Sequence, residues 1–304
     1  MDAAELRVIT GPTAAGKSAI ALHLAERYGA IIISADSRQI YRGFDIGTAK
    51  PSAAEQARVP HRGIDVATPE ERYSAARWAA AATGWIDAAT SAGREVLLVG
   101  GTGFYLRALI DPLFREPELD AGRRAQLQRY LDGFSVAELR RWCSTLDASR
   151  AHLGRTQLLR SMEIALLTGE RLSQLHARTA GQGRRRARYL VVDPGAVLPE
   201  RIARRVDEML AAGWIDEARR LALSVPHDAP AWNAAGYRVI REASTGGVPL
   251  PVAREQVLIE TRQYAKRQRT WLRHQLGDAR VLRINPDAPD SIARAEHWWS
   301  GEDG

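Results

Sequence analysis

The chain has 304 residues, of which 45% are hydrophobic and 26% charged, so it can bury one large core or two unequal ones. Its apolar runs are too short to cross a bilayer, its N-terminus lacks a signal-peptide pattern, and one cysteine excludes an internal disulfide. We therefore expect a cytoplasmic protein without membrane contact. The net charge of +7 favours an anionic partner, nucleic acid above all.

Short apolar segments alternate with helical patterns along the first hundred residues. Strands are expected at residues 6–10, 30–36, 61–69 and 94–101. Helices are expected at residues 18–29, 73–93 and 102–110. This alternation predicts an α/β protein with a parallel sheet flanked by helices, in which ligands bind at the carboxyl ends of the strands.

The pattern changes near Pro117, where strand signals give way to helical ones. Helices are expected at residues 123–133, 135–147, 156–169 and 171–179, followed by a strand at 189–194. More helices are expected at residues 198–214, 215–223, 231–246 and 252–277. We therefore predict a core in two parts, 1–117 and 188–304, with a helical insertion domain at 118–187.

The segment "GPTAAGKS" fits the pattern G-x-x-x-x-G-K-[ST] between an expected strand and an expected helix. In this pattern, backbone N–H groups surround a phosphate, and the positive N-terminal end of the helix adds to the attraction. The lysine reaches a bridging or terminal phosphate, and the hydroxyl of Ser18 can hold Mg²⁺. The predicted phosphate loop consists of Gly11, Pro12, Thr13, Ala14, Ala15, Gly16, Lys17 and Ser18.

Two polar residues at strand ends are candidates for chemistry. A P-loop ATPase usually has a carboxylate at the end of a strand, but here "EVLLV" ends in "GGTG" and supplies the hydroxyl of Thr102. Thr102 is either the N-cap of the next helix or a ligand contact. Asp36 ends an earlier strand, and is either an N-cap or a general base that takes a proton from an attacking group. We favour the general base, because Asp36 lies on the ligand edge of the sheet.

The segment "DSRQIYRGFDIGTAKP", residues 36–51, combines cationic and amide side chains with an aromatic ring and two glycines. Such groups bind phosphates and the edges of bases. The segment therefore indicates contacts to phosphates and bases from Arg38, Gln39, Tyr41, Arg42, Thr48 and Lys50. The alternative is an ordinary surface loop that contains arginine and tyrosine.

The long helix expected at residues 252–277 has an apolar stripe and a basic face. The basic face consists of Arg262, Lys266, Arg269 and Arg273, spaced i, i+4, i+7 and i+11, which places them within an arc roughly 60° wide. One sign of charge over three turns is typical of a helix that follows a phosphate backbone. The alternative is a solvated face in an arginine-rich protein, since only three of the 43 basic residues are lysines.

Six segments, taken in order and at suitable spacing, resemble one known family. They are "GPTAAGKS", "ISADSRQIYRGFDIGTAKP", "PHRGIDV", "LLVGGTGFYLRALI", "NAAGYRVI" and "TRQYAKRQRTWLRHQ", from about Val8 to His274. Together they resemble the tRNA dimethylallyltransferases, also called tRNA isopentenyltransferases. The resemblance implies a P-loop NTPase-like sheet with a helical insertion that grips the anticodon stem-loop of tRNA.

The resemblance also implies an activity and roles for single residues. The dimethylallyl group of dimethylallyl diphosphate goes to the exocyclic amine of the adenosine immediately 3′ of the anticodon, with Mg²⁺ as the ion. Asp36 falls on the general base, Thr102 on a hydroxyl near the reacting centre, and Arg238 on an arginine that helps to bind the diphosphate. The residues expected to contact tRNA are Asp36, Ser37, Arg38, Gln39, Lys50, Arg160, Gln263, Lys266 and Arg267. Thr156 and Gln157 depart from the residues usual in the family.

For the function that the resemblance implies, we expect a monomer. Three alternative functions stay open. The first is a small-molecule kinase, with ATP in the phosphate loop and Asp36 as base toward a hydroxyl. The second is an isopentenyltransferase acting on free adenine nucleotide, which would need no insertion to grip tRNA. The third is a non-catalytic RNA-binding module with a relic phosphate loop. This alternative does not explain why Asp36 and Thr102 lie on the same edge of the sheet.

Overall fold

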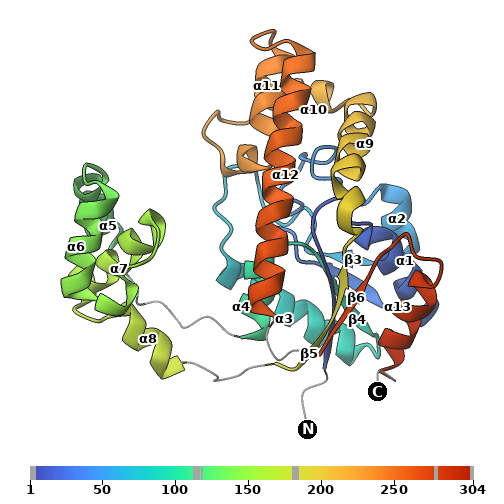
Figure 1. Ribbon diagram of the computed structural model, residues 1–304, viewed down its shortest axis with the longest axis horizontal. Coiled ribbons are helices and arrows are strands. Elements are labelled where there is room, and N and C mark those ends of the chain that lie inside the picture. Colours follow the sequence, from blue (N-terminus) through green and yellow to red (C-terminus); the bar gives the residue numbers. More distant parts are fainter. Residues whose placement is uncertain (1–4, 112–116, 118, 180–184, 277–279, 302–304) are drawn as a thin grey trace. The chain divides into compact units, whose positions relative to one another are not determined.

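The computed structural model describes residues 5–111, 117, 119–179, 185–276 and 280–301 (Figure 1). The chain divides into two compact units: a core unit of Met1–Ile110 with Arg185–Gly304, and an inserted unit of Asp111–Arg184. The predicted insertion boundaries, 118–187, stay a prediction, because residues close to both ends lie outside the described ranges.

The core unit is built on a six-stranded sheet in which all neighbouring strands are parallel. The order is β3-β2-β4-β1-β5-β6, with β1 Leu6–Thr10, β2 Ile31–Ser34, β3 His61–Arg62, β4 Val96–Val99, β5 Ala187–Val192 and β6 Arg280–Ile284. The central strands are nearly continuous apolar runs because both faces of a parallel sheet are buried. All five predicted strands are present, but the one predicted at 61–69 is a strand only over His61–Arg62. Strand β6 was not predicted, because its two arginines interrupt the apolar pattern of an edge strand.

Helices cover the sheet (Figure 1), and their apolar side chains pack against those of the strands in the core. On one face, α1 (Lys17–Tyr28) and α13 (Ser291–Ser300) form a buried cluster with side chains of β1, β4, β5 and β6. Near β2 and β4 lie α3 (Ala75–Ser91) and α4 (Gly103–Ile110), which pack against each other. The other helices of the core unit are α2 Ala53–Arg58, α9 Leu198–Ala211, α10 Trp214–Ala222, α11 Tyr237–Ser244 and α12 Leu250–Gln275.

The 26-residue helix α12 has the predicted apolar stripe, which is buried at Val257, Leu258, Ala265 and Leu272. It packs against α9, α11 and α4, so one helix touches elements from both sequence segments of the core unit. This position brings α12 to the carboxyl edge of the sheet, where the phosphate loop lies.

The inserted unit consists of helices, as predicted. They are α5 Ala121–Asp132, α6 Val136–Leu146, α7 Arg155–Thr168 and α8 Leu172–Thr179. Leu131, Leu139, Cys143, Leu158 and Met162 form its own buried core. Among the described residues, no helix combines the length and apolar character needed to cross a membrane.

Candidate active site

The phosphate loop lies between β1 and α1, as the pattern predicts. A Cβ on Gly11 would lie 2.1 Å from the carbonyl oxygen of Val192 at the end of β5, so a larger residue would collide with the backbone. Gly16 is the N-cap of α1, with φ of 92° in the left-handed region that favours glycine. Both glycines are therefore required by the path of the loop.

Lys17, the first residue of α1, turns back over the loop, and its Nζ donates a hydrogen bond to the carbonyl oxygen of Pro12 at 2.7 Å. Burial, followed by repulsion from Arg205, lowers the pKa of Lys17 to about 8, with Asp36 acting in the opposite direction. An arriving polyphosphate would favour the ammonium form. Lys17 is therefore a buried cation whose protonation would respond to an anion placed beside it.

One cavity at the carboxyl edge of the sheet brings several predicted residues together. Its lining includes the phosphate-loop residues Thr13, Ala14, Lys17 and Ser18, and the residues Asp36, Arg38 and Gln39 that follow β2. Helices α9 and α12 supply Arg205, Tyr264 and Gln268. An anion-binding loop, a carboxylate and amide groups thus surround one space, as the rule for parallel sheets predicted.

Asp36 and Thr102 are connected through Ser37. The Asp36 Oδ1 atom accepts the N–H of Arg38 at 2.8 Å, which closes a turn, while its side chain lines the cavity. Thr102 lies just before α4, but its Oγ1 accepts the N–H of Ser37 at 3.0 Å and donates to Ser37 Oγ at 3.3 Å. Thr102 therefore stabilises the backbone that carries Asp36.

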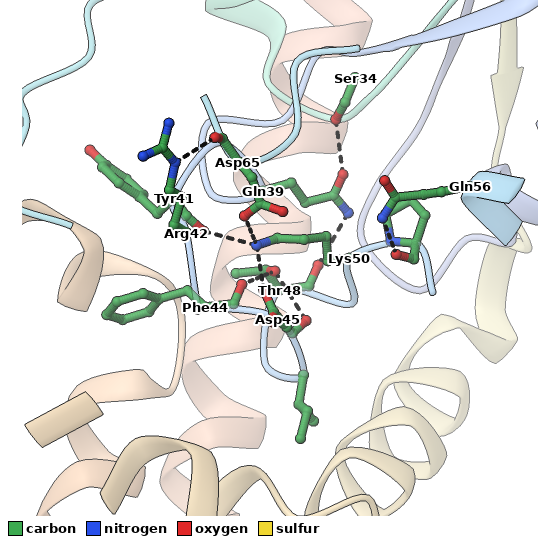
Figure 2. A network of polar contacts seen from close by, with 12 residues as sticks. Ser34, Gln39, Tyr41, Arg42, Phe44, Asp45, Thr48, Lys50, Gln56 and Asp65 are labelled. Atoms are coloured by element: carbon green, nitrogen blue, oxygen red, sulfur yellow. Dashed lines mark hydrogen bonds and ion pairs between the residues drawn. The ribbon is translucent and has the colours of Figure 1, made fainter. Parts of the chain in front are cut away.

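Lys50 lies inside the 36–51 loop rather than on its surface (Figure 2). Its side chain is 4% exposed, and its Nζ donates to the carbonyl oxygen of Tyr41 at 2.9 Å and to Asp65 at 2.6 Å. It also contacts Asp45. All three ammonium protons thus have partners within this part of the chain, and its role in tRNA binding stays a prediction.

Gln39 belongs to the same network (Figure 2). Its Oε1 accepts the hydroxyl of Ser34 at 2.9 Å, and its Nε2 donates to the carbonyl oxygens of Thr48 and Ala49 at 3.3 and 3.0 Å. The amide therefore joins the end of β2 to the far end of the loop, while also lining the cavity.

Buried groups from α10 and α11 hold the middle of this loop. The Glu217 carboxylate accepts the N–H groups of Asp45 and Ile46 at 3.2 and 2.8 Å. The Tyr237 hydroxyl donates to Glu217 at 2.6 Å and accepts the N–H of Gly47 at 3.1 Å. Burial, followed by the charge of Glu217, raises the pKa of Tyr237, so this hydroxyl stays protonated. The loop is thus a rigid wall of the site.

Arg238 lies in a neighbouring cavity rather than beside the phosphate loop. This second cavity is also lined by Gln263, Arg267, Arg38 and Tyr264, and the Arg238 guanidinium donates to Asn233. Because the cavities share Arg38 and Tyr264, they are adjacent. The structure thus groups Arg238 with residues predicted to bind tRNA, and its predicted contact with the diphosphate stays untested.

The basic face of α12 differs from its predicted form at one position. Arg262, Lys266 and Arg273 are exposed. Arg269 instead forms a two-pronged ion pair with Asp193 beyond the end of β5, with Arg269 Nε 2.9 Å from a carboxylate oxygen. In the inserted unit, the Arg160 guanidinium donates to the buried carboxylate of Glu163 at 2.7 Å, and its predicted contact with tRNA stays a prediction.

Three residues of the site were not singled out from the sequence, although Tyr264 and Gln268 lie in the stretch "RQYAKRQ", which by resemblance falls on a tRNA-contacting segment. The guanidinium of Arg205 reaches the cavity from α9, near Lys17 and Asp36. Burial, followed by the charge of Asp36, raises the pKa of Tyr264 to about 12. Gln268 is buried beside the loop. Each interrupts the apolar side of an amphipathic helix with a polar group, which is the signal that could have indicated them.

The fold and the site define an enzyme of the P-loop NTPase-like α/β class. The IPP transferase family model matches residues 39–275, and the isopentenyl transferase model matches residues 4–62. The chain therefore belongs to the IPP transferase family, the tRNA dimethylallyltransferases, which confirms the resemblance. It is a prenyltransferase of a family whose substrate is tRNA, and this sets aside the kinase and the non-catalytic RNA-binding module.

Curated tRNA dimethylallyltransferases are similar in sequence to this chain over 90% or more of its length. A tRNA dimethylallyltransferase of Anaeromyxobacter sp. is 42% identical over 300 residues, which cover 96% of this chain and 99% of that protein. One from Halorhodospira halophila is 44% identical over 283 residues, which cover 90% and 91%.

Solved structures support the same fold class. A tRNA isopentenylpyrophosphate transferase from Bacillus halodurans, 33% identical, superposes with a TM-score of 0.71 over 98% of this chain and 96% of that chain. A eukaryotic dimethylallyltransferase acting on tRNA reaches a TM-score of 0.83 at 23% identity, over 98% and 80% of the two chains. The predicted P-loop NTPase-like fold is confirmed by these neighbours.

Proposed function

We propose that this enzyme transfers the dimethylallyl group of dimethylallyl diphosphate to the exocyclic amine of the adenosine immediately 3′ of the anticodon. The observation that carries the proposal is that Lys17 of the phosphate loop and Asp36 line one cavity. In the proposed reaction, the site of the anionic leaving group and the carboxylate base would face the same reacting carbon.

The phosphate loop and Arg205 would hold the diphosphate. The loop amides, the Lys17 ammonium and the Arg205 guanidinium supply positive charge where negative charge grows as the carbon–oxygen bond breaks. One preorganised donor of this kind is typically worth roughly 3–4 kcal/mol. The pKa of Lys17, lowered to about 8 mainly by burial, rises again when the anion arrives.

The site also suits Mg²⁺. This ion prefers oxygen ligands and is commonly held by one or two protein groups together with substrate phosphates and water. The Ser18 hydroxyl, at the start of α1, lines the cavity beside Lys17 and would hold the ion against the diphosphate. When bound, the ion would offset charge on the leaving group.

Asp36 would act as the general base. The adenine amine attacks the allylic carbon, a carbon–nitrogen bond forms, the carbon–oxygen bond breaks, and diphosphate leaves with the bonding electrons. The amine becomes acidic as it attacks, and its proton passes to the Asp36 carboxylate. Thr102 holds the Ser37 backbone, and so keeps Asp36 at the edge of the cavity.

The tRNA would approach through the second cavity. Arg38, Arg238 and Arg267 line it and supply positive charge for the phosphates of the RNA. The target adenosine must leave its stack to reach Asp36, at a cost of a few kcal/mol. The exposed cation Lys266 and the inserted unit with Arg160 would offset this cost by holding the RNA.

The proposed function is tested by identifying the product. The enzyme is incubated with Mg²⁺, labelled dimethylallyl diphosphate and an unmodified anticodon stem-loop, and the RNA is digested to nucleosides. We expect prenylated adenosine from this RNA, and none from a control RNA with guanosine 3′ of the anticodon. Equal prenylation of free adenosine monophosphate would favour the free-nucleotide isopentenyltransferase instead. Transfer to the guanosine RNA would contradict the proposed target.

A further inference from the structure

The side-chain amide of Gln268 connects two loops of the site from α12. The residue is 6% exposed. Its Oε1 accepts the N–H of Thr13 in the phosphate loop at 2.8 Å, and its Nε2 donates to the carbonyl oxygen of Gly101 after β4 at 2.9 Å. Both ends of one amide are thus bonded to backbone groups of two different loops.

The first bond acts on the group that holds Lys17. The N–H of Thr13 belongs to the same planar peptide unit as the carbonyl of Pro12. That carbonyl oxygen accepts hydrogen bonds from Lys17 Nζ at 2.7 Å and from the N–H of Ala15 at 3.3 Å. By fixing one side of the peptide unit, Gln268 sets the direction of the carbonyl that holds the lysine.

The second bond acts on the loop that carries Thr102. The carbonyl of Gly101 shares its peptide unit with the N–H of Thr102, which donates to the carbonyl oxygen of Ala35 at 3.1 Å. Ala35 directly precedes Asp36. The approach is close, since a Cβ on Gly101 would lie 2.1 Å from Gln268 Nε2. Glycine at this position therefore leaves room for the amide.

We propose that Gln268 is a positioning residue, which sets the distance between the phosphate loop with Lys17 and the Thr102 turn beside Asp36. The proposal rests on the proposed function, because it concerns the same site. An amide is required, since one bond needs an acceptor and the other a donor. Glutamate of the same shape lacks the donor, and methionine of similar length lacks both.

The test compares Gln268→Met and Gln268→Glu with the wild-type enzyme. We expect kcat/KM for dimethylallyl diphosphate to fall by roughly 10- to 100-fold in both, because small displacements of reacting groups cost rates of this order. Binding of inorganic diphosphate with Mg²⁺, measured by calorimetry, should weaken in parallel. The Kd for the anticodon stem-loop should change by less than about twofold, since both amide ends contact the protein backbone.

The matched control is Leu272→Val, one turn further along α12. Leu272 is 4% exposed and lies outside the lining of the active-site cavity, so this variant lowers the Tm without touching the two loops. A merely structural Gln268 would give variants that lose Tm like the control yet keep wild-type kcat/KM and diphosphate binding, which would overturn the proposal. A wild-type enzyme that makes no prenylated adenosine would instead overturn the proposed function, and the binding comparison would still test Gln268.

Discussion

The phosphate loop and the 36–51 loop both follow buried strands of the sheet, both contain two glycines, and both contain a lysine that the sequence singled out. Lys17 makes one hydrogen bond to a carbonyl oxygen and lines the cavity. Lys50 instead donates to Tyr41, Asp45 and Asp65. In one loop the cation faces the ligand space, whereas in the other it holds the loop together.

The difference between the two lysines arises from contacts across long stretches of chain. Asp65 lies fifteen residues after Lys50, and Glu217, which holds the loop backbone, lies far along the chain. A motif of cationic residues therefore indicates that positive charge is needed at that place in the chain. Which groups pair with that charge depends on the fold. Residues that act on substrate should therefore respond to substitution differently from residues that shape the site.

The largest effect is expected for Asp36→Asn. The amide keeps the size of the side chain and the turn to Arg38, but it cannot take a proton, so transfer should fall by roughly 10²- to 10⁴-fold. Binding of the anticodon stem-loop should stay within a few-fold of wild type. Product formation is measured in single-turnover reactions, and transfer within a few-fold of wild type would rule out Asp36 as the base.

The two lysines should respond differently to the same substitution. Lys17→Met should lower kcat/KM for the donor by roughly 10²- to 10³-fold, as expected when one preorganised charge is removed, with little change in Tm. Lys50→Met should instead lower the free energy of unfolding by about 2 kcal/mol. This is less than for a fully buried pair, because Asp45 and Asp65 are 55% and 46% exposed.

Kinetic and thermal measurements on the two variants check this pair. The comparison fails if Lys50→Met loses donor binding as strongly as Lys17→Met while keeping its wild-type Tm. Lys50 would then act on the donor, which differs both from a role inside the loop and from the tRNA contact that the sequence predicted.

A dependence on pH follows from the lowered pKa of Lys17, about 8 in the free enzyme, with burial as its main cause. Well below pH 8 the ammonium predominates, so Lys17 itself adds no pH dependence to diphosphate binding. Above pH 8 the free enzyme loses this proton, so the affinity should fall by up to about tenfold per pH unit, with a proton taken up on binding. Calorimetry in two buffers of different ionisation enthalpy measures this uptake, and a flat profile up to pH 9.5 would contradict the assignment.

The smallest effect is expected for Lys266→Ala on the exposed side of α12. If Lys266 contacts a phosphate of the tRNA, its loss should weaken binding a few-fold and reduce the slope of log K against log salt by about 1. Arg254→Ala, on the same helix and paired with Asp207, serves as the control that removes one charge elsewhere. An unchanged slope in Lys266→Ala would show that this residue does not touch phosphate.

Much of the fold could be predicted, because local patterns determine it. Strands β1, β2, β4 and β5 are apolar runs, and the phosphate loop has its own spacing, so both can be read without knowing the rest of the molecule. The edge strand β6 and helix α13 could not be read in this way, since β6 mixes exposed, half-buried and buried residues and contains two arginines. Their placement depends on pairing with β5 and packing against α1.

The site was predictable where one short segment provides the chemistry. Asp36 and Lys17 were identified from their places after strands, and the structure brings them to one cavity. Arg205 and Gln268 were missed, because each occurs within a helix whose pattern otherwise describes packing. Their side chains can be recognised as parts of the site only when the positions of α9 and α12 beside the phosphate loop are known.

In the proposed reaction, the carbon–oxygen bond of an allylic diphosphate breaks in the same cavity in which the carbon joins adenine. The most direct measurement is a rapid-quench single turnover with anticodon stem-loop and a donor labelled in both the prenyl group and the diphosphate. We predict that prenylated adenosine and intact diphosphate appear at the same rate and in equal amounts, and that neither forms without RNA. Release of orthophosphate, or of diphosphate without prenylated RNA, would contradict the account.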